Sequence, residues 1–158
     1  MTDRVLWRIA SDTQAFVADD LSGAGAENTG GRWNAPGTPM LYSSPSIALA
    51  VLETLVHMSA GSLPLNRYLV RLTVPNPVWA KATWADGANL VGWDAVPAGK
   101  VSRDWGSAWS TSASSAIAIV PSVVVPEEVN VLINPRHPDA SRIGARKLRR
   151  WVYDPRTR

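Results

Sequence analysis

Short runs of apolar residues recur along the chain, and this pattern predicts several short strands. The clearest run is 67–74, where Tyr68, Val70 and Leu72 alternate with residues of the opposite face, so this strand buries at least one face. Shorter apolar runs predict further strands at 5–10, 39–43, 116–120, 122–125 and 130–134. Prolines end several of these runs, because proline removes a backbone donor from a sheet ladder.

One segment has the spacing of a helix. Between residues 46 and 58, apolar side chains recur every three or four positions: Ile47, Val51, Leu55 and Met58. Further apolar residues widen this stripe, so the helix is expected to be apolar almost all round and largely buried. Ser44 and Pro45 precede it as the expected N-cap and first helical residue.

The remaining segments are irregular in pattern. Residues 11–27 leave room for a short helix, and residues 79–113 contain five unevenly spaced tryptophans and no clear period. Many short strands with few helices indicate an α+β protein, built from mixed sheets of short strands and a few helices. With 158 residues and no repeat or linker, the chain is predicted to be a single domain, 1–158.

The composition mainly excludes certain classes of site and of protein. The chain has no cysteine, which excludes disulfide scaffolds, thiolate zinc sites and cysteine nucleophiles. It has no apolar run of about 20 residues and no basic–apolar start, so we expect no membrane span and no secretory signal, and hence a cytoplasmic protein.

The charge is unevenly distributed. The net charge is +3, but the segment from Arg142 to Arg158 holds seven basic residues and one acidic residue, so the rest of the chain is mildly acidic. This is not the pattern of a dedicated nucleic-acid binder, whose charge lines a whole face. The basic segment is either a solvated terminal helix or strand, or a docking surface for an acidic partner or a phosphate-bearing ligand.

Two charged residues, Glu53 and Arg32, lie in local settings where a charged side chain is unusual. Glu53 lies within the apolar helix, where a carboxylate is costly unless it is paired. It either forms a structural ion pair, with Arg32 or Arg71, or lies at the wall of a pocket. Arg32 follows two glycines in a turn; its guanidinium either grips a phosphate or carboxylate, or stacks on Trp33 at the surface.

Tyr42 and Ser122 are further candidates. The ring of Tyr42 either stacks on a flat ligand or fills the core, and the Ser122 hydroxyl either serves a site or bonds nearby backbone. His57 follows Glu53 by one helical turn, but one carboxylate and one imidazole are too few for a zinc site, so no metal is expected.

In combination, these residues resemble the RES domain family, which is named for its Arg, Glu and Ser. Its members are the toxins of bacterial type II toxin–antitoxin pairs whose antitoxins are of the Xre helix-turn-helix class. The most specific parts are Gly30-Gly31-Arg32-Trp33-Asn34 and Asn134-Pro135-Arg136-His137-Pro138. The other matching stretches are Leu6-Trp7-Arg8, Leu41-Tyr42-Ser43-Ser44, Ala50-Val51-Leu52-Glu53, Pro121-Ser122 and Asn130-Val131-Leu132-Ile133.

The resemblance implies a fold similar to ADP-ribosyltransferases and diphtheria-type toxins, with a cleft that binds NAD as the substrate. By carry-over, Glu53 holds a ribose hydroxyl and stabilises the positive charge that develops when the nicotinamide–ribose bond breaks. Arg32 clamps the pyrophosphate or a nicotinamide-side group, and Tyr42 stacks on the nicotinamide ring. Ser122 hydrogen-bonds the nicotinamide amide or the nearby ribose.

The family also implies partners and alternatives. An Xre-type antitoxin is expected to cover the cleft with its C-terminal region, its terminal carboxylate on Arg32, and a toxin homodimer can form within the complex. The antitoxin, rather than this chain, would contact DNA, and no membrane is involved. The favoured function is degradation of NAD by water or phosphate, and the runner-up is ADP-ribosyl transfer to a protein. A third possibility is an RNA- or ribosome-binding module that uses the basic segment and exposed tryptophans.

Overall fold

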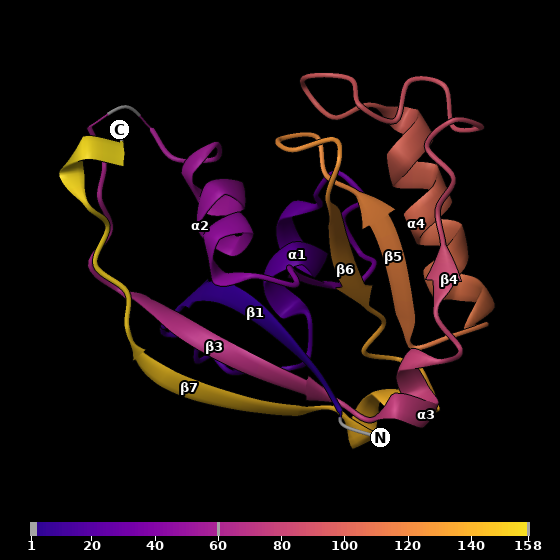
Figure 1. Ribbon diagram of the computed structural model, residues 1–158, viewed down its shortest axis with the longest axis horizontal. Coiled ribbons are helices and arrows are strands. Elements are labelled where there is room, and N and C mark those ends of the chain that lie inside the picture. Colours follow the sequence, from indigo (N-terminus) through magenta and orange to yellow (C-terminus); the bar gives the residue numbers. More distant parts are fainter. Residues whose placement is uncertain (1–2, 60, 158) are drawn as a thin grey trace.

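Two sheets form the frame of the computed structural model, which describes residues 3–59 and 61–157 (Figure 1). The first sheet is antiparallel, with strand order β1-β3-β7: Arg4–Ser11, Arg67–Val74 and Gly144–Arg150. The second has the order β2-β6-β5-β4: Leu41–Ser43, Val129–Ile133, Ile117–Pro121 and Thr83–Trp84, with β4 and β5 parallel. The α+β prediction is confirmed.

Helices cover these sheets from different sides. They are α1 (Ala24–Thr29), α2 (Ile47–Leu55), α3 (Asn76–Trp79) and α4 (Lys100–Ser112), with short 3-10 turns at Pro138–Arg142 and Pro155–Thr157. Figure 1 shows α2 beside β1 and β3, and α4 along β4 and β5. In α2, Ala50 and Leu55 pack against Ile9 and Leu69 of the first sheet.

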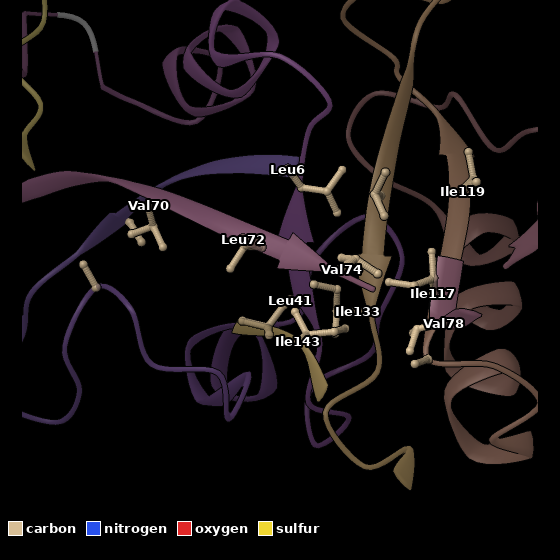
Figure 2. Close-up of a cluster of buried hydrophobic side chains, with 14 residues drawn as sticks. Leu6, Leu41, Val70, Leu72, Val74, Val78, Ile117, Ile119, Ile133 and Ile143 are labelled. Carbon is tan, nitrogen blue, oxygen red and sulfur yellow. The ribbon is translucent and has the colours of Figure 1, made fainter. Parts of the chain in front are cut away.

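The largest core cluster lies where the two sheets meet. Leu72 and Val74 of β3 share this cluster with Ile117 of β5 and Ile133 of β6, and Figure 2 shows these side chains converging. All four are at most 1% exposed. Since each fully buried aliphatic side chain contributes roughly 1.5–3 kcal/mol, this cluster holds the strands that carry the candidate site residues in fixed relative positions.

The helix around Glu53 differs from its prediction in two ways. Its N-cap is Ser46, whose Oγ accepts a hydrogen bond from Leu49 N at 3.1 Å, rather than Ser44. Ser44 instead pairs with Trp7 through the backbone, because the chain is still extended there. The helix is only half buried: Leu52 is 40% and Val56 56% exposed, since the sheet covers one side of the helix.

Two further predictions along the chain are wrong. Residues 79–113 were expected to be irregular, but they contain the thirteen-residue α4. Its buried positions include Ser102, Gly106 and Ser110, which a search for apolar spacing does not register. The expected strand 122–125 is a loop, in which the Ser122 Oγ accepts a hydrogen bond from Val125 N at 3.0 Å.

The basic terminal segment forms an edge strand. Along β7, Arg146, Arg149 and Arg150 are exposed, while Lys147 forms an ion pair with Asp12 at 3.0 Å. The structure therefore agrees with a solvated strand, and its use as a docking surface stays a prediction. No helix in residues 3–59 and 61–157 is both long and apolar enough to cross a membrane.

Gly106 allows α4 to lie against the loop that carries Arg32. A Cβ at position 106 would be only 1.8 Å from the carbonyl oxygen of Trp33. We therefore expect Gly106→Ala to lower the free energy of unfolding by about 1–3 kcal/mol, although alanine favours helix formation. Denaturant unfolding measures this, with Gly144→Ala as the control, because a Cβ at 144 meets no atom within 4 Å. Equal stability of the two variants would contradict the tight contact.

Candidate active site

A cleft of about 980 Å³ brings together three of the four predicted site residues. Arg32, Tyr42 and Glu53 all line it. They come from the loop after α1, from β2 and from α2, so the fold assembles side chains that are ten or more positions apart. Trp7 and Arg8 of β1, Asn130 of β6 and residues 96–98 complete the wall.

Glu53 is held by hydrogen bonds rather than by an ion pair. Its Oε2 accepts from Asn130 Nδ2 at 2.7 Å, and its Oε1 accepts from Ser122 Oγ at 3.4 Å. Neither Arg32 nor Arg71 pairs with it among the described ion pairs. Burial raises the pKa of Glu53, and the two hydrogen bonds and the charges of His57 and Arg32 only partly oppose this rise. The result is a carboxylate in a fixed orientation at the wall of the cleft.

Ser122 lies behind Glu53 rather than at the cleft surface. It is fully buried and is not among the residues that line the cleft. Its hydroxyl donates to Glu53 and accepts from Val125 N, so it bonds both the candidate carboxylate and nearby backbone. In this arrangement the hydroxyl meets the Glu53 carboxylate, and its direct contact with NAD stays a prediction.

Tyr42 lines the cleft, packs against the core cluster that includes Trp33 and Met40, and binds the Arg32 loop through its hydroxyl. The hydroxyl donates to Asn34 Oδ1 and accepts from Trp33 N at 3.1 Å. Burial raises the pKa of this phenol, so it stays protonated. A Cβ at position 31 would lie 2.6 Å from the Tyr42 oxygen, which is why the position before Arg32 is glycine. Tyr42 thus braces the loop that presents Arg32.

Arg32 lines the cleft and is held by two backbone carbonyl groups. Its Nη1 donates to the carbonyl oxygens of Trp93 at 2.9 Å and Ala95 at 2.8 Å. Within the described residues, no hydrogen bond engages its Nη2 or Nε. Stacking on Trp33 was the alternative, but Trp33 packs against Trp93 and Trp105 instead. Burial lowers the pKa of Arg32, which nonetheless leaves a cation with donors for an anionic ligand.

Sequence reasoning quoted two further residues of the cleft only as parts of matching stretches and gave them no role. Arg8 of β1 has a buried Nε without a hydrogen-bond partner in the described structure, and burial lowers its pKa to about 10. Arginine within an apolar strand was the signal that could have identified it. Asn130 holds Glu53, yet an asparagine at the start of a strand carries no sequence signal for that role.

The charge of the cleft favours an anionic ligand. Among the described residues that line it, Arg8, Arg32 and Arg67 are cationic and Glu53 is the one carboxylate. The part of the chain that the structure describes holds no group of three or more side chains that could bind a metal ion. A phosphate-bearing molecule with a flat ring matches the arginines and the Tyr42 ring.

Comparisons with known proteins identify the family. A family model described as RES domain matches residues 5–154. The Prs ADP-ribosylating toxin of Sphingobium sp. (strain YBL2) is 60% identical over 151 residues, covering 95% of this chain and 94% of the relative. Proteins named Toxin Res from Yersinia enterocolitica and Pseudomonas putida are 35% and 36% identical, covering 84% and 86% of this chain and 85% and 88% of theirs.

A solved structure supports the fold. The toxin–antitoxin complex MbcT–MbcA of M. tuberculosis contains a chain that matches with a TM-score of 0.60. The match covers 98% of this chain and 86% of that chain, at 16% identity, so it supports the fold alone.

Proposed function

Since the chain belongs to the RES domain family, we propose that it is the toxin of a toxin–antitoxin pair that consumes NAD by breaking its nicotinamide–ribose bond. In this proposal residues 1–158 act as one NAD-binding domain. The observation that carries it is a single carboxylate, Glu53, oriented by Asn130 and Ser122 in a cleft that also holds three arginines.

The chemistry of the bond requires such a carboxylate. As nicotinamide leaves, positive charge develops on the ribose, as in glycoside hydrolysis. The ionised Glu53 stabilises this charge, and the partly buried setting strengthens the attraction compared with water. Glu53 would hold a ribose hydroxyl, Arg32 the pyrophosphate or a nicotinamide-side group, and the Tyr42 ring the nicotinamide.

Two residues take supporting roles. Ser122 acts as a positioning residue, because its hydroxyl bonds the Glu53 carboxylate and does not line the cleft. Arg8 offers a buried guanidinium with an unused Nε on the cleft wall. Its Nη1 donates to the Tyr42 carbonyl oxygen at 3.5 Å, and the NAD pyrophosphate would supply an anionic partner for the guanidinium.

The acceptor of ADP-ribose defines two versions of this function. The sequence alone favoured degradation of NAD by water or phosphate. The relative with 60% identity, however, carries a name that states ADP-ribosylation of Prs. This name favours transfer to a protein for the present chain, and degradation becomes the alternative.

An antitoxin partner belongs to the same proposal. Uncontrolled loss of NAD would harm the cell that makes this protein, so a partner should cover the cleft. Val56 and Val96 line the cleft and are 56% and 80% exposed, so such a partner would cover apolar side chains there. We propose an Xre-type antitoxin whose terminal carboxylate binds Arg32 and which contacts DNA itself, in a complex that holds two copies of the toxin.

Nicotinamide release tests the proposal. The purified chain, free of antitoxin, is incubated with NAD with and without phosphate, and nicotinamide is followed by chromatography. Label from adenylate-labelled NAD that appears on a protein of a bacterial extract identifies transfer, whereas free ADP-ribose identifies hydrolysis. A folded protein that neither binds NAD nor releases nicotinamide would overturn the proposed function.

The hydrogen bond from Asn130 makes a prediction about pH. This bond favours the ionised form of Glu53, so Asn130→Ala should raise the pKa of Glu53 further. Turnover needs the ionised carboxylate, and its loss on acidification should therefore begin at a higher pH in the variant. At neutral pH we expect about a tenfold lower rate, the effect of one hydrogen bond to a charged group. Asn66→Ala, outside the cleft, is the control; identical pH profiles of all three proteins would contradict this role.

A further inference from the structure

The proposed function does not say which group takes the proton that the acceptor must lose. When water, a hydroxyl or an amine attacks C1′ of the ribose, a lone pair of the acceptor forms the new C1′ bond. The electron pair of the old C1′–N bond leaves with nicotinamide and neutralises its ring. The acceptor then carries an extra proton, which must pass to a base within reach.

Most ionisable groups of the cleft do not serve as this base. Among the described lining residues these groups are Arg8, Arg32, Tyr42, Glu53, His57 and Arg67. The three guanidinium groups are donors that keep their protons near neutral pH, including Arg8 with its pKa of about 10. The Tyr42 hydroxyl already donates to Asn34, and burial raises its pKa.

In the proposed function Glu53 must stay ionised to stabilise the charge on the ribose. Both of its oxygens accept hydrogen bonds, from Asn130 and Ser122, which fix the carboxylate in one orientation. Its ionised form is needed to stabilise the charge on the ribose, and accepting the proton at that moment would remove this stabilisation. Glu53 therefore suits the departure of nicotinamide rather than the activation of the acceptor.

His57 remains, and its position fits the task. It follows Glu53 by four residues in the turn that continues α2, where His57 N donates to the carbonyl oxygen of Thr54 at 3.2 Å. Its charge contributes to the pKa of Glu53, so the two side chains are electrostatically coupled. Its side chain is exposed and also lines the cleft, which places it at the rim, where an acceptor enters from solvent.

We propose that His57 is the general base that removes the proton from the acceptor. This inference rests on the proposed function and deepens it by naming the acceptor class. A base at the rim is needed for water, a hydroxyl, an amine or a guanidine, whereas a carboxylate or a phosphate dianion attacks without losing a proton. The acceptor is accordingly a protic nucleophile.

The role of His57 has a signature in the pH profile. The charged groups around it in the cleft are Glu53 on α2, Arg32 on the loop, and Arg8 and Arg67 on the first sheet. A general base must be unprotonated to accept the proton, so a catalytic base contributes to the pH dependence of turnover. The pH profiles of the wild type and of His57→Ala should therefore differ in shape.

His57→Ala tests the proposal through nicotinamide release between pH 5 and 9, with water alone and with phosphate as acceptor. We expect hydrolysis to fall about 10²-fold or more, with the KM for NAD unchanged, a pH profile that differs in shape from the wild type and partial rescue by imidazole. Any phosphorolysis that the wild type shows should fall less than twofold. His137→Ala, at the N-cap of the 3-10 turn Pro138–Arg142 and not among the residues that line the cleft, is the matched control, and circular dichroism checks the fold of each variant.

Each outcome decides a different point. A His57→Ala protein with the wild-type rate and pH profile would overturn the role of His57 and leave the proposed function standing. Equal losses with water and with phosphate would overturn the assignment as a base, because phosphate needs none. A wild-type protein that turns over no NAD with water, with phosphate or with a bacterial extract as acceptor would instead be the failure of the proposed function.

Discussion

Glu53→Gln should abolish NAD turnover in a protein that stays folded. Glutamine preserves the shape of the side chain but removes the negative charge that faces the ribose in the transition state. Because loss of a single oriented group at such a site costs about 10²–10³-fold, and Glu53 is the only carboxylate among the described residues that line the cleft, we expect at least a 10³-fold decrease. Nicotinamide release measures this, and Glu127→Gln, in an exposed loop, is the control.

The same variant should be no less stable than the wild type. Burial raises the pKa of Glu53 in the folded protein, so the folded state binds this proton more tightly than the unfolded chain. Wild-type stability therefore decreases as the pH rises through the unfolded pKa of a glutamate, and Glu53→Gln escapes that loss. Its melting temperature relative to the wild type should increase from acid to neutral pH. Turnover within tenfold of the wild type would remove Glu53 from the mechanism.

Arg32→Ala is expected to weaken NAD binding strongly. It removes a cation from the cleft together with two hydrogen bonds that hold the carbonyl groups of Trp93 and Ala95. Loss of one charge-assisted contact costs about 1.5–3 kcal/mol, so the KM for NAD should rise roughly 10–100-fold. Calorimetric titration with ADP-ribose measures the same loss without turnover.

Arg32→Lys separates charge from geometry. Lysine keeps the positive charge, but its compact ammonium lacks the planar fork that spans two carbonyl groups and an anion. We expect a KM between those of the wild type and Arg32→Ala. Arg136→Ala, which removes an arginine outside the cleft that pairs with Glu27, should leave the KM unchanged. Full activity of Arg32→Lys would show that only the charge matters.

Local pattern was sufficient for much of the fold. Alternation between residues 67 and 74 predicted β3 with its observed bounds, and the helical spacing after residue 46 predicted α2. These predictions succeed because the period of the apolar residues depends on the element itself and on one buried face. Arg32, Tyr42 and Glu53 also emerged from the sequence, since each is a costly or conspicuous residue in its local setting.

α4 shows where local pattern fails. The side of this helix that faces the core is built partly from serine and glycine, because the backbone of Trp33 approaches Gly106 too closely for a larger side chain. The need for small residues comes from a contact with a loop more than seventy positions earlier. Such a contact leaves no period in the sequence.

The sequence by itself determined the class of the fold, the main strands, one helix and the candidate chemistry of Arg32, Tyr42 and Glu53. Only the tertiary structure decided how these groups are used. In the folded protein Glu53 accepts hydrogen bonds from Asn130 and Ser122 instead of pairing with an arginine. Ser122 lies behind Glu53 and is not among the residues that line the cleft. The physical reason is that a buried polar group takes the partners that packing brings within hydrogen-bond distance, and packing joins β6, the loop after β5 and α2 across some seventy residues of chain.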